Sequence, residues 1–103
     1  MYDVFFSTLA DRTKLDIINI LSKNDLNVSE ISKKLNLEQS RVSHNLKVLL
    51  ERNFVIVSQK GKSRVYSLEK KTITPLLKII DKHVENYYSD YCKCKGIPWR
   101  KRA

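Results

Sequence analysis

The first third of the chain places apolar and polar residues with the spacing of short helices. Residues 2–9 are largely apolar and suit a first helix that packs on a neighbour. Asp11 predicts the start of a second helix over about 11–23, because a short carboxylate accepts hydrogen bonds from the unpaired amides of a first turn. Asn27, followed three residues later by a glutamate, resembles a capping box and predicts a third helix over 28–35.

The next segment predicts an amphipathic helix over 38–52 and then a β-hairpin. The apolar residues of the helix share one stripe, which consists of Val42, Leu46, Leu49 and Leu50. Segments 54–58 and 63–68 are β-branched or aromatic, and they flank Gln-Lys-Gly-Lys, whose Gly61 suits a tight turn. Three cations mark the tip of this hairpin: Lys60, Lys62 and Arg64.

A long apolar stripe marks the C-terminal third. It predicts a helix over about 72–94 that ends before Gly96 and precedes a basic tail, 95–103, and its members are Ile73, Leu76, Leu77, Ile80, Val84, Tyr87, Tyr88 and Tyr91. A single domain over 1–103 has little left to cover such a face, so we expect a second copy of the chain to cover it. The expected fold class is mainly α with a small β-hairpin.

The charge of the chain is strongly positive and unevenly distributed. Lys and Arg number 20 against 11 Asp and Glu, a net charge of +9. Residues 1–32 hold three basic and five acidic residues, whereas residues 33–64 hold eight basic and two acidic. A positive charge concentrated in one region is typical of proteins that bind polyanions.

Helix, short turn, helix and basic hairpin, in that order, predict a winged helix-turn-helix that binds double-stranded DNA. The DNA major groove accepts one α-helix, and a cationic hairpin suits the adjacent phosphates. Residues 38–47 contain many side chains that can form hydrogen bonds with bases and phosphates. They are Gln39, Ser40, Arg41, Ser43, His44, Asn45 and Lys47. We expect Arg41 to contact guanine, and Lys60, Lys62 and Arg64 to contact phosphates.

Three other interpretations compete with DNA binding. The polar residues of 38–47 can be the solvated face of a surface helix. A winged helix can also bind proteins, although a basic outer face argues against a protein partner. An enzyme is not expected, because the chain has no Gly-rich phosphate loop and no nucleophile with a base at motif spacing.

Several segments resemble the ArsR/SmtB family of prokaryotic metal-sensing repressors. They are LADRTKLDIINIL, with Arg12 and Lys14 where the family has Pro and Arg, then LNVSEISKKLNLEQSRVSHNLKVLLERNFV, and GKSRVYSL for the wing. The resemblance implies a homodimer through the N- and C-terminal helices that binds a palindromic operator as a repressor. It also implies a base-reading role for residues around Gln39 to His44 and a phosphate-contacting role for the wing.

The resemblance also directs attention to two metal sites of the family. One uses Cys-x-Cys in the helix before the recognition helix, and here those positions are Asn27 and Ser29, so that site is absent. The other lies in the last helix, where Asp81, His83 and Cys94 match three of four positions, Ile97 occupies the fourth, and Cys92 offers a replacement ligand. A zinc-like or soft metal ion is therefore one candidate signal.

The two cysteines leave other signals open. A disulfide between Cys92 and Cys94 would be strained, since one residue separates them. Lys93 and Lys95 favour a thiolate, so thiol oxidation is a second candidate, and a repressor without a small-molecule signal is a third. With no signal-peptide pattern and no long apolar stretch, we expect a cytoplasmic protein that does not contact membranes.

Overall fold

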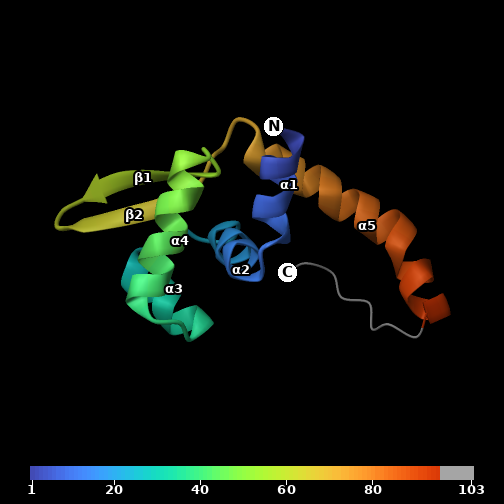
Figure 1. Ribbon diagram of the computed structural model, residues 1–103, viewed down its shortest axis with the longest axis horizontal. Helices are drawn as coiled ribbons and strands as arrows, with labels where there is room; N and C mark the ends of the chain where they lie inside the picture. Colours follow the sequence, from blue (N-terminus) through green and yellow to red (C-terminus); the bar gives the residue numbers. More distant parts are fainter. Residues whose placement is uncertain (96–103) are drawn as a thin grey trace. The chain divides into compact units, whose positions relative to one another are not determined.

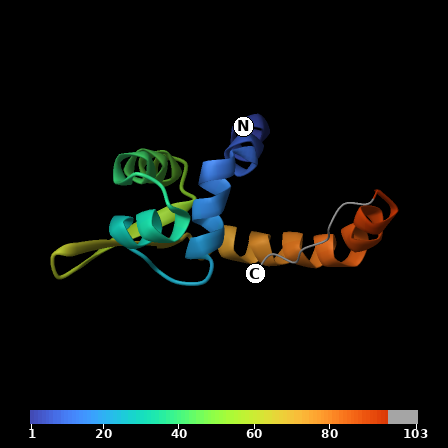
Figure 2. The ribbon, with the colours of Figure 1, turned by 90° about the horizontal axis from the view of Figure 1, so that it is seen from below.

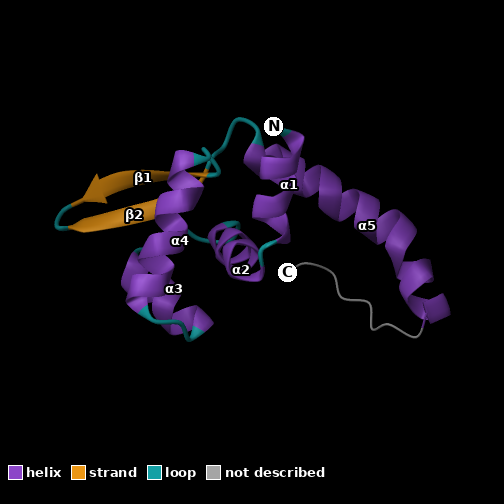
Figure 3. Ribbon diagram, in the orientation of Figure 1, coloured by secondary structure: helices purple, strands orange, loops and turns teal. Residues whose placement is uncertain are grey.

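In the computed structural model the chain falls into two compact units, and the structure describes the backbone of residues 1–95 and the side chains of residues 1–86. The first unit covers Met1–Glu69 and the second begins at Lys70. The first contains four helices and a hairpin: α1 Tyr2–Ala10, α2 Arg12–Leu21, α3 Val28–Leu35, α4 Gln39–Glu51, β1 Val55–Lys60 and β2 Ser63–Leu68. The second contains α5, Ile73–Lys95 (Figure 1, Figure 3). The mainly α fold with a small hairpin is confirmed.

The caps predicted for the second and third helices are present. Asp11 Oδ2 accepts a hydrogen bond from the Lys14 amide at 3.0 Å and caps α2. The Asn27 side chain accepts from the Glu30 amide, and the Glu30 carboxylate accepts from the Asn27 amide, both at 2.9 Å. The capping box is thus complete, and α3 has the predicted bounds. It ends at Asn36, whose left-handed backbone (φ 54°) stops the helix.

The core of the first unit joins α2, α3 and α4 to the base of the hairpin. Fully buried side chains come from each of these elements, namely Ile17, Ile18, Ile31, Val42, Leu46, Leu49 and Phe54. Helix α1 contributes Phe5, whose ring centroid lies 5.0 Å from that of Phe54. Each buried side chain contributes roughly 1.5–3 kcal/mol, so this shared core fixes α4 against its neighbours.

The hairpin is longer and its turn is tighter than the sequence predicts. The antiparallel register runs from Val55 opposite Leu68 to Lys60 opposite Ser63, which leaves two residues in the turn. Of these two, Gly61 alone has a positive φ (61°), as the first position of a type II′ turn requires. The predicted strand bounds 54–58 are therefore wrong, because β1 continues through the first two residues of the expected loop.

A single backbone bridge ties the hairpin to the loop before α3. Leu26 and Tyr66 exchange two hydrogen bonds, with N···O distances of 3.0 and 2.8 Å, and both side chains are buried. This bridge holds the base of the hairpin beside the helix-turn-helix. The tip projects beyond α3 and α4 in both views (Figure 1, Figure 2).

Helix α5 is a single helix of 23 residues, and the predicted span 72–94 is confirmed to within one residue at each end. Ile79 and Ile80 are exposed on it. The predicted stripe members Tyr87, Tyr88 and Tyr91 fall where side chains are not described, and residues 96–103 of the basic tail lie outside the described residues. None of the described helices combines the length and apolarity that crossing a membrane requires.

Candidate nucleic-acid interface

The outer face of α4 carries four of the predicted DNA-binding residues. Ser40, Ser43, His44 and Lys47 are all exposed, and their spacing places them on one face of the helix. The opposite face carries Val42, Leu46 and Leu49 into the core. A helix anchored on one side presents these polar groups together on the other, as direct contact with base edges requires.

Two further predicted residues, Gln39 and Arg41, are exposed but attached to neighbouring helices. Gln39 Nε2 donates to Ser29 Oγ of α3 at 3.2 Å. Arg41 Nη2 donates to Thr13 Oγ1 of α2 at 2.9 Å. The first turn of α4 is thus held by hydrogen bonds to α3 on one side and to α2 on the other. A contact between Arg41 and a guanine requires its guanidinium to turn away from Thr13.

Asn45 is buried inside the protein and does not lie on the outer face of α4. It is 7% exposed; its Oδ1 accepts from Lys14 Nζ at 3.0 Å, and its Nδ2 donates to the Arg41 carbonyl oxygen at 2.8 Å. Including Asn45 among the groups suited to DNA was wrong, because both ends of its amide are satisfied inside the protein. The spacing of Asn45 along the helix could have indicated its burial. It lies three residues after Val42 and four before Leu49, which places it at the edge of the buried face.

The Asn45 contact belongs to a polar chain that begins at the cap of α2. Lys14 Nζ lies 3.6 Å from Asp11 Oδ2 as well as 3.0 Å from Asn45 Oδ1. The Lys14 amide lowers the pKa of Asp11 from its usual value; partial burial opposes this, and the charges of Lys14 and Arg41 lower the pKa further. Asp11 therefore stays ionised near neutral pH, and a charged group anchors the start of α2 beside α4.

A second polar contact holds the end of α4. Arg52 Nη1 donates to Thr8 Oγ1 of α1 at 2.6 Å, and Thr8 is almost completely buried. Neither residue was singled out from the sequence, since 44 positions separate them. With the core between them, these contacts hold the helix at both ends.

The wing carries the three remaining DNA-binding candidates. Lys60 and Lys62 are exposed at the tip, on either side of Gly61. Arg64 is exposed too, and its guanidinium carbon lies 5.8 Å from the centroid of the Tyr66 ring. Because Tyr66 is buried and bonded to Leu26, Arg64 has a more fixed position than the two lysines.

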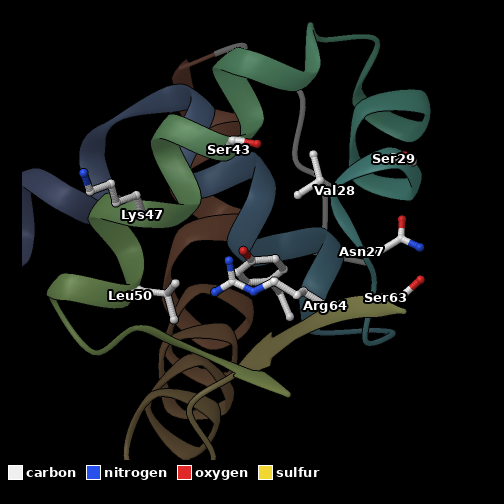
Figure 4. A pocket seen from close by; sticks show the side chains of 9 residues that line it. Asn27, Val28, Ser29, Ser43, Lys47, Leu50, Ser63 and Arg64 are labelled. Atoms are coloured by element: carbon white, nitrogen blue, oxygen red, sulfur yellow. The ribbon is translucent and has the colours of Figure 1, made fainter. Parts of the chain in front are cut away.

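A groove of about 500 Å³ separates α4 from the wing and the start of α3. Figure 4 shows the side chain of Arg64 extending from the hairpin toward α4. The lining residues are Asn27, Val28, Ser29, Ser43, Lys47, Leu50, Ser63, Arg64 and Tyr66. The groove thus joins parts of the helix and the wing that the sequence presents as separate sites.

The predicted metal ligands lie on α5 and are not gathered into a site by the part of the chain that the structure describes. Asp81 is half-buried and His83 exposed. The side chains of Cys92 and Cys94 lie outside the described residues, although both positions are within the helix. Among described residues no three His, Cys, Asp or Glu side chains come together as a metal would require. Eleven helical residues span about 16 Å, so one chain does not bring His83 and Cys94 to one ion.

Comparison with known proteins identifies a family. The profile described as "Bacterial regulatory protein, arsR family" matches residues 11–57, from the cap of α2 into β1. The "Transcriptional repressor SmtB homolog" of Synechocystis sp. is 30% identical over 86 residues, which are 84% of this chain and 57% of that protein. This chain therefore spans little more than half the length of that relative.

Two mycobacterial proteins are similar over more of their length. The "HTH-type transcriptional regulator NmtR" of Mycobacterium tuberculosis is 34% identical, over 78% of this chain and 67% of that protein. The crystal structure of Rv0081 from the same organism superposes with a TM-score of 0.78 at 30% identity, covering 87% of this chain and 91% of that one. The chain belongs to the ArsR family of bacterial regulatory proteins and is a DNA-binding transcription regulator with a winged helix-turn-helix fold.

Proposed function

We propose that the protein is a dimeric transcriptional repressor that places α4 in the major groove of its operator and the wing on the adjacent phosphates. The outer face of α4 carries this proposal: Ser40, Ser43, His44 and Lys47 are all exposed there, and the opposite face is anchored in the core. Such a regulator acts on the chromosome, in the bacterial cytoplasm.

The composition of that face favours DNA over a protein partner. The major groove is about 12 Å wide, close to the diameter of an α-helix with its side chains. Hydroxyl, imidazole and ammonium groups suit base edges and phosphates, whereas protein-binding surfaces favour aromatic and apolar groups at their centre. The only large apolar residue bordering the groove from α4 is Leu50.

A homodimer is the second part of the proposal. Helix α1 exposes Met1, Tyr2, Val4 and Phe6, with Tyr2 83% and Phe6 59% exposed, and α5 exposes Ile79. Apolar side chains concentrated on one helix suit a self-complementary interface between two copies. Two copies related by a two-fold axis present two α4 helices to two half-sites, which fits a palindromic operator.

Three alternative signals could release the protein from its operator. Carboxylate, imidazole and thiolate groups suit a zinc-like ion, but the helical spacing of Asp81 and His83 from the cysteines demands ligands from two subunits. Thiol oxidation at Cys92 or Cys94 is the second alternative, and a repressor without a small-molecule signal is the third. Titrating zinc, nickel, cadmium, arsenite or an oxidant into the protein–operator complex distinguishes them.

A binding experiment with the DNA upstream of the protein's own gene tests the function. Wild-type protein should shift this DNA at concentrations that leave a scrambled duplex unbound. A His44→Ala/Lys47→Ala variant should lose the shift and keep the wild-type unfolding midpoint, since both residues are exposed. Lys23→Ala, which removes an exposed charge after α2, is the control. Equal affinity of wild-type protein for both duplexes would contradict sequence-specific binding.

A further inference from the structure

Helix α1 is attached to the end of α4 on one side and exposes apolar residues on the other. The exposed apolar residues, here called the dimer face, are Met1, Tyr2, Val4 and Phe6. We infer that Thr8 and Arg52 are positioning residues that hold α4 in a fixed place relative to the dimer face, and so set the spacing between half-sites that the protein accepts. This inference rests on the proposed dimer and operator, and names what sets the geometry of their complex.

The end of α4 is tightly closed by a Schellman motif. The Phe54 amide donates to the Leu49 carbonyl oxygen at 2.9 Å, and the Asn53 amide donates to that of Leu50 at 3.1 Å. Asn53 adopts the left-handed backbone that this motif requires, with φ 61°. The backbone of Arg52 and Phe54 is therefore fixed relative to α4.

Both Arg52 and Phe54 contact α1. Arg52 Nη1 donates to Thr8 Oγ1 at 2.6 Å, and the Thr8 hydroxyl donates its own hydrogen to the Val4 carbonyl oxygen at 2.7 Å. The ring centroid of Phe5 lies 5.0 Å from that of Phe54. One hydrogen bond and one ring contact thus join α1 to the end of α4.

Thr8 is important to this attachment because α1 buries little else. All nine residues of α1 are described, and among them Thr8 alone is buried, with 1% of its surface exposed. Shielding from water and a charged donor both strengthen its hydrogen bond with Arg52. Breaking this bond should loosen α1 and leave the contact between Phe5 and Phe54 in place.

The aromatic rings of α1 connect the end of α4 with the dimer face. Phe6 meets Phe5 edge to face, with centroids 5.4 Å apart, and Tyr2 stacks on Phe6 at 6.5 Å. Phe5 in turn contacts Phe54, whose side chain is buried directly after α4. A second copy that covers Tyr2 and Phe6 therefore binds the same helix that is attached to the end of α4.

A fixed attachment has a consequence for DNA recognition. A two-fold dimer binds two half-sites, and the separation of its two recognition helices must match the separation of the half-sites. Freedom between the dimer face and α4 would let the two α4 helices reach half-sites at several spacings. A fixed α4 restricts the protein to one spacing and lowers the entropy lost on binding. Thr8 and Arg52 therefore add specificity without contacting a base.

The test compares wild-type protein with Thr8→Val and Arg52→Met on the operator and on derivatives with one or two base pairs inserted between the half-sites. Each inserted pair moves one half-site by about 3.4 Å along the DNA axis and also rotates it. Wild type should bind the derivatives much more weakly than the operator. Both variants should lose roughly three- to tenfold in operator affinity, as expected for one hydrogen bond, and should discriminate less between spacings. Their affinity for an isolated half-site should not change.

Thr8→Val separates positioning from direct contact with DNA, because it leaves the charge of Arg52 in place. Thr8→Ser keeps the hydroxyl and should behave as wild type. Ser7→Ala is the matched control, since the Ser7 hydroxyl donates to the same Val4 carbonyl oxygen at 3.0 Å but is exposed. The double variant Thr8→Val/Arg52→Met should bind no more weakly than either single variant. Sedimentation should show all these proteins as dimers at micromolar concentration.

Three results would overturn the coupling alone, given a dimeric wild type that prefers its operator. They are an unchanged penalty for the inserted base pairs in both variants, losses that multiply in the double variant, and an effect of Arg52→Met that Thr8→Val does not share. Wild-type protein that is monomeric at micromolar concentration would overturn the proposed dimer and the coupling together. Wild-type protein with equal affinity for operator and scrambled DNA would overturn the proposed function itself.

Discussion

Helix α4 and the tip of the wing both expose cations that we propose contact DNA, yet the protein holds the two elements very differently. The N-terminal half of α4 is attached to α2 through Arg41 and Asn45 and to α3 through Gln39, and the inner face of the helix is fully buried. At the tip, Lys60 ends β1 and Lys62 lies in the two-residue turn, and the described residues offer the two side chains no hydrogen bond or ion pair.

This difference suggests a division of labour. Groups on a helix that is itself held in place discriminate between bases, because a wrong base leaves their hydrogen bonds unmade. Unrestrained lysines reach a phosphate on any sequence and contribute affinity through counterion release. Substitutions that loosen α4 should therefore reduce stability and specificity, whereas substitutions at the tip should change only general affinity.

The largest effect is expected where the core anchors α4. Leu46 is fully buried, so Leu46→Ala should lower the free energy of unfolding by about 2–5 kcal/mol. This loss is a large fraction of the free energy of unfolding of a typical domain, which is roughly 5–15 kcal/mol. Ile56→Ala in the wing is the comparison; since Ile56 is 46% exposed, it should cost about 1 kcal/mol or less. Urea unfolding measures both, and similar losses would show that the wing is as much a part of the core as α4.

A smaller effect is expected at the polar bridge between α2 and α4. Lys14→Met keeps the length of the side chain and removes the donor to Asn45, so unfolding should become easier by about 1–3 kcal/mol. The same variant should bind operator less selectively, because Asn45 also holds the Arg41 carbonyl oxygen. Lys23→Met, at an exposed lysine, is the control. If the two variants match in stability and selectivity, the bridge does not position α4.

The smallest stability effect is expected at the cap of α2. At neutral pH, Asp11→Ala should cost about 1 kcal/mol through the lost cap. Because the pKa of Asp11 is lowered by folding from its usual 3.8, the ionised cap stabilises the protein above that pH. This contribution should disappear as pH falls through the lower, folded value. Urea unfolding of wild type, Asp11→Ala and the loop control Asp25→Ala at pH 7 and pH 3 checks this. A constant gap between wild type and Asp11→Ala would contradict it.

Local features of the fold were predictable from the sequence. The capping box at Asn27, the cap at Asp11 and the stripe of α4 depend on residues within one or two turns of each other, so the pattern alone specifies them. The outer face of α4 was predicted for the same reason. The two-residue turn at Gly61 was missed because strand residues and loop residues have similar polarity there.

Contacts between distant segments were not predictable in this way. The pairing of Asn45 with Lys14 joins positions 31 residues apart, and neither side chain has a local signal of its partner. The bridge between Leu26 and Tyr66 and the groove beside it depend likewise on how the hairpin packs against the helices. Sequence reasoning therefore identified the exposed polar face of α4 and the basic tip of the hairpin but missed what holds them in place.

The most direct test of the division of labour compares Arg41→Ala with Lys62→Ala on operator and scrambled DNA at several salt concentrations. Arg41→Ala should reduce the ratio of the two affinities, since a bidentate contact to guanine contributes on the order of 1–3 kcal/mol of discrimination. Lys62→Ala should weaken binding to both duplexes alike and lower the salt slope by about one. An Arg41→Ala protein that keeps its affinity ratio, or a Lys62→Ala protein with an unchanged slope, would contradict the account.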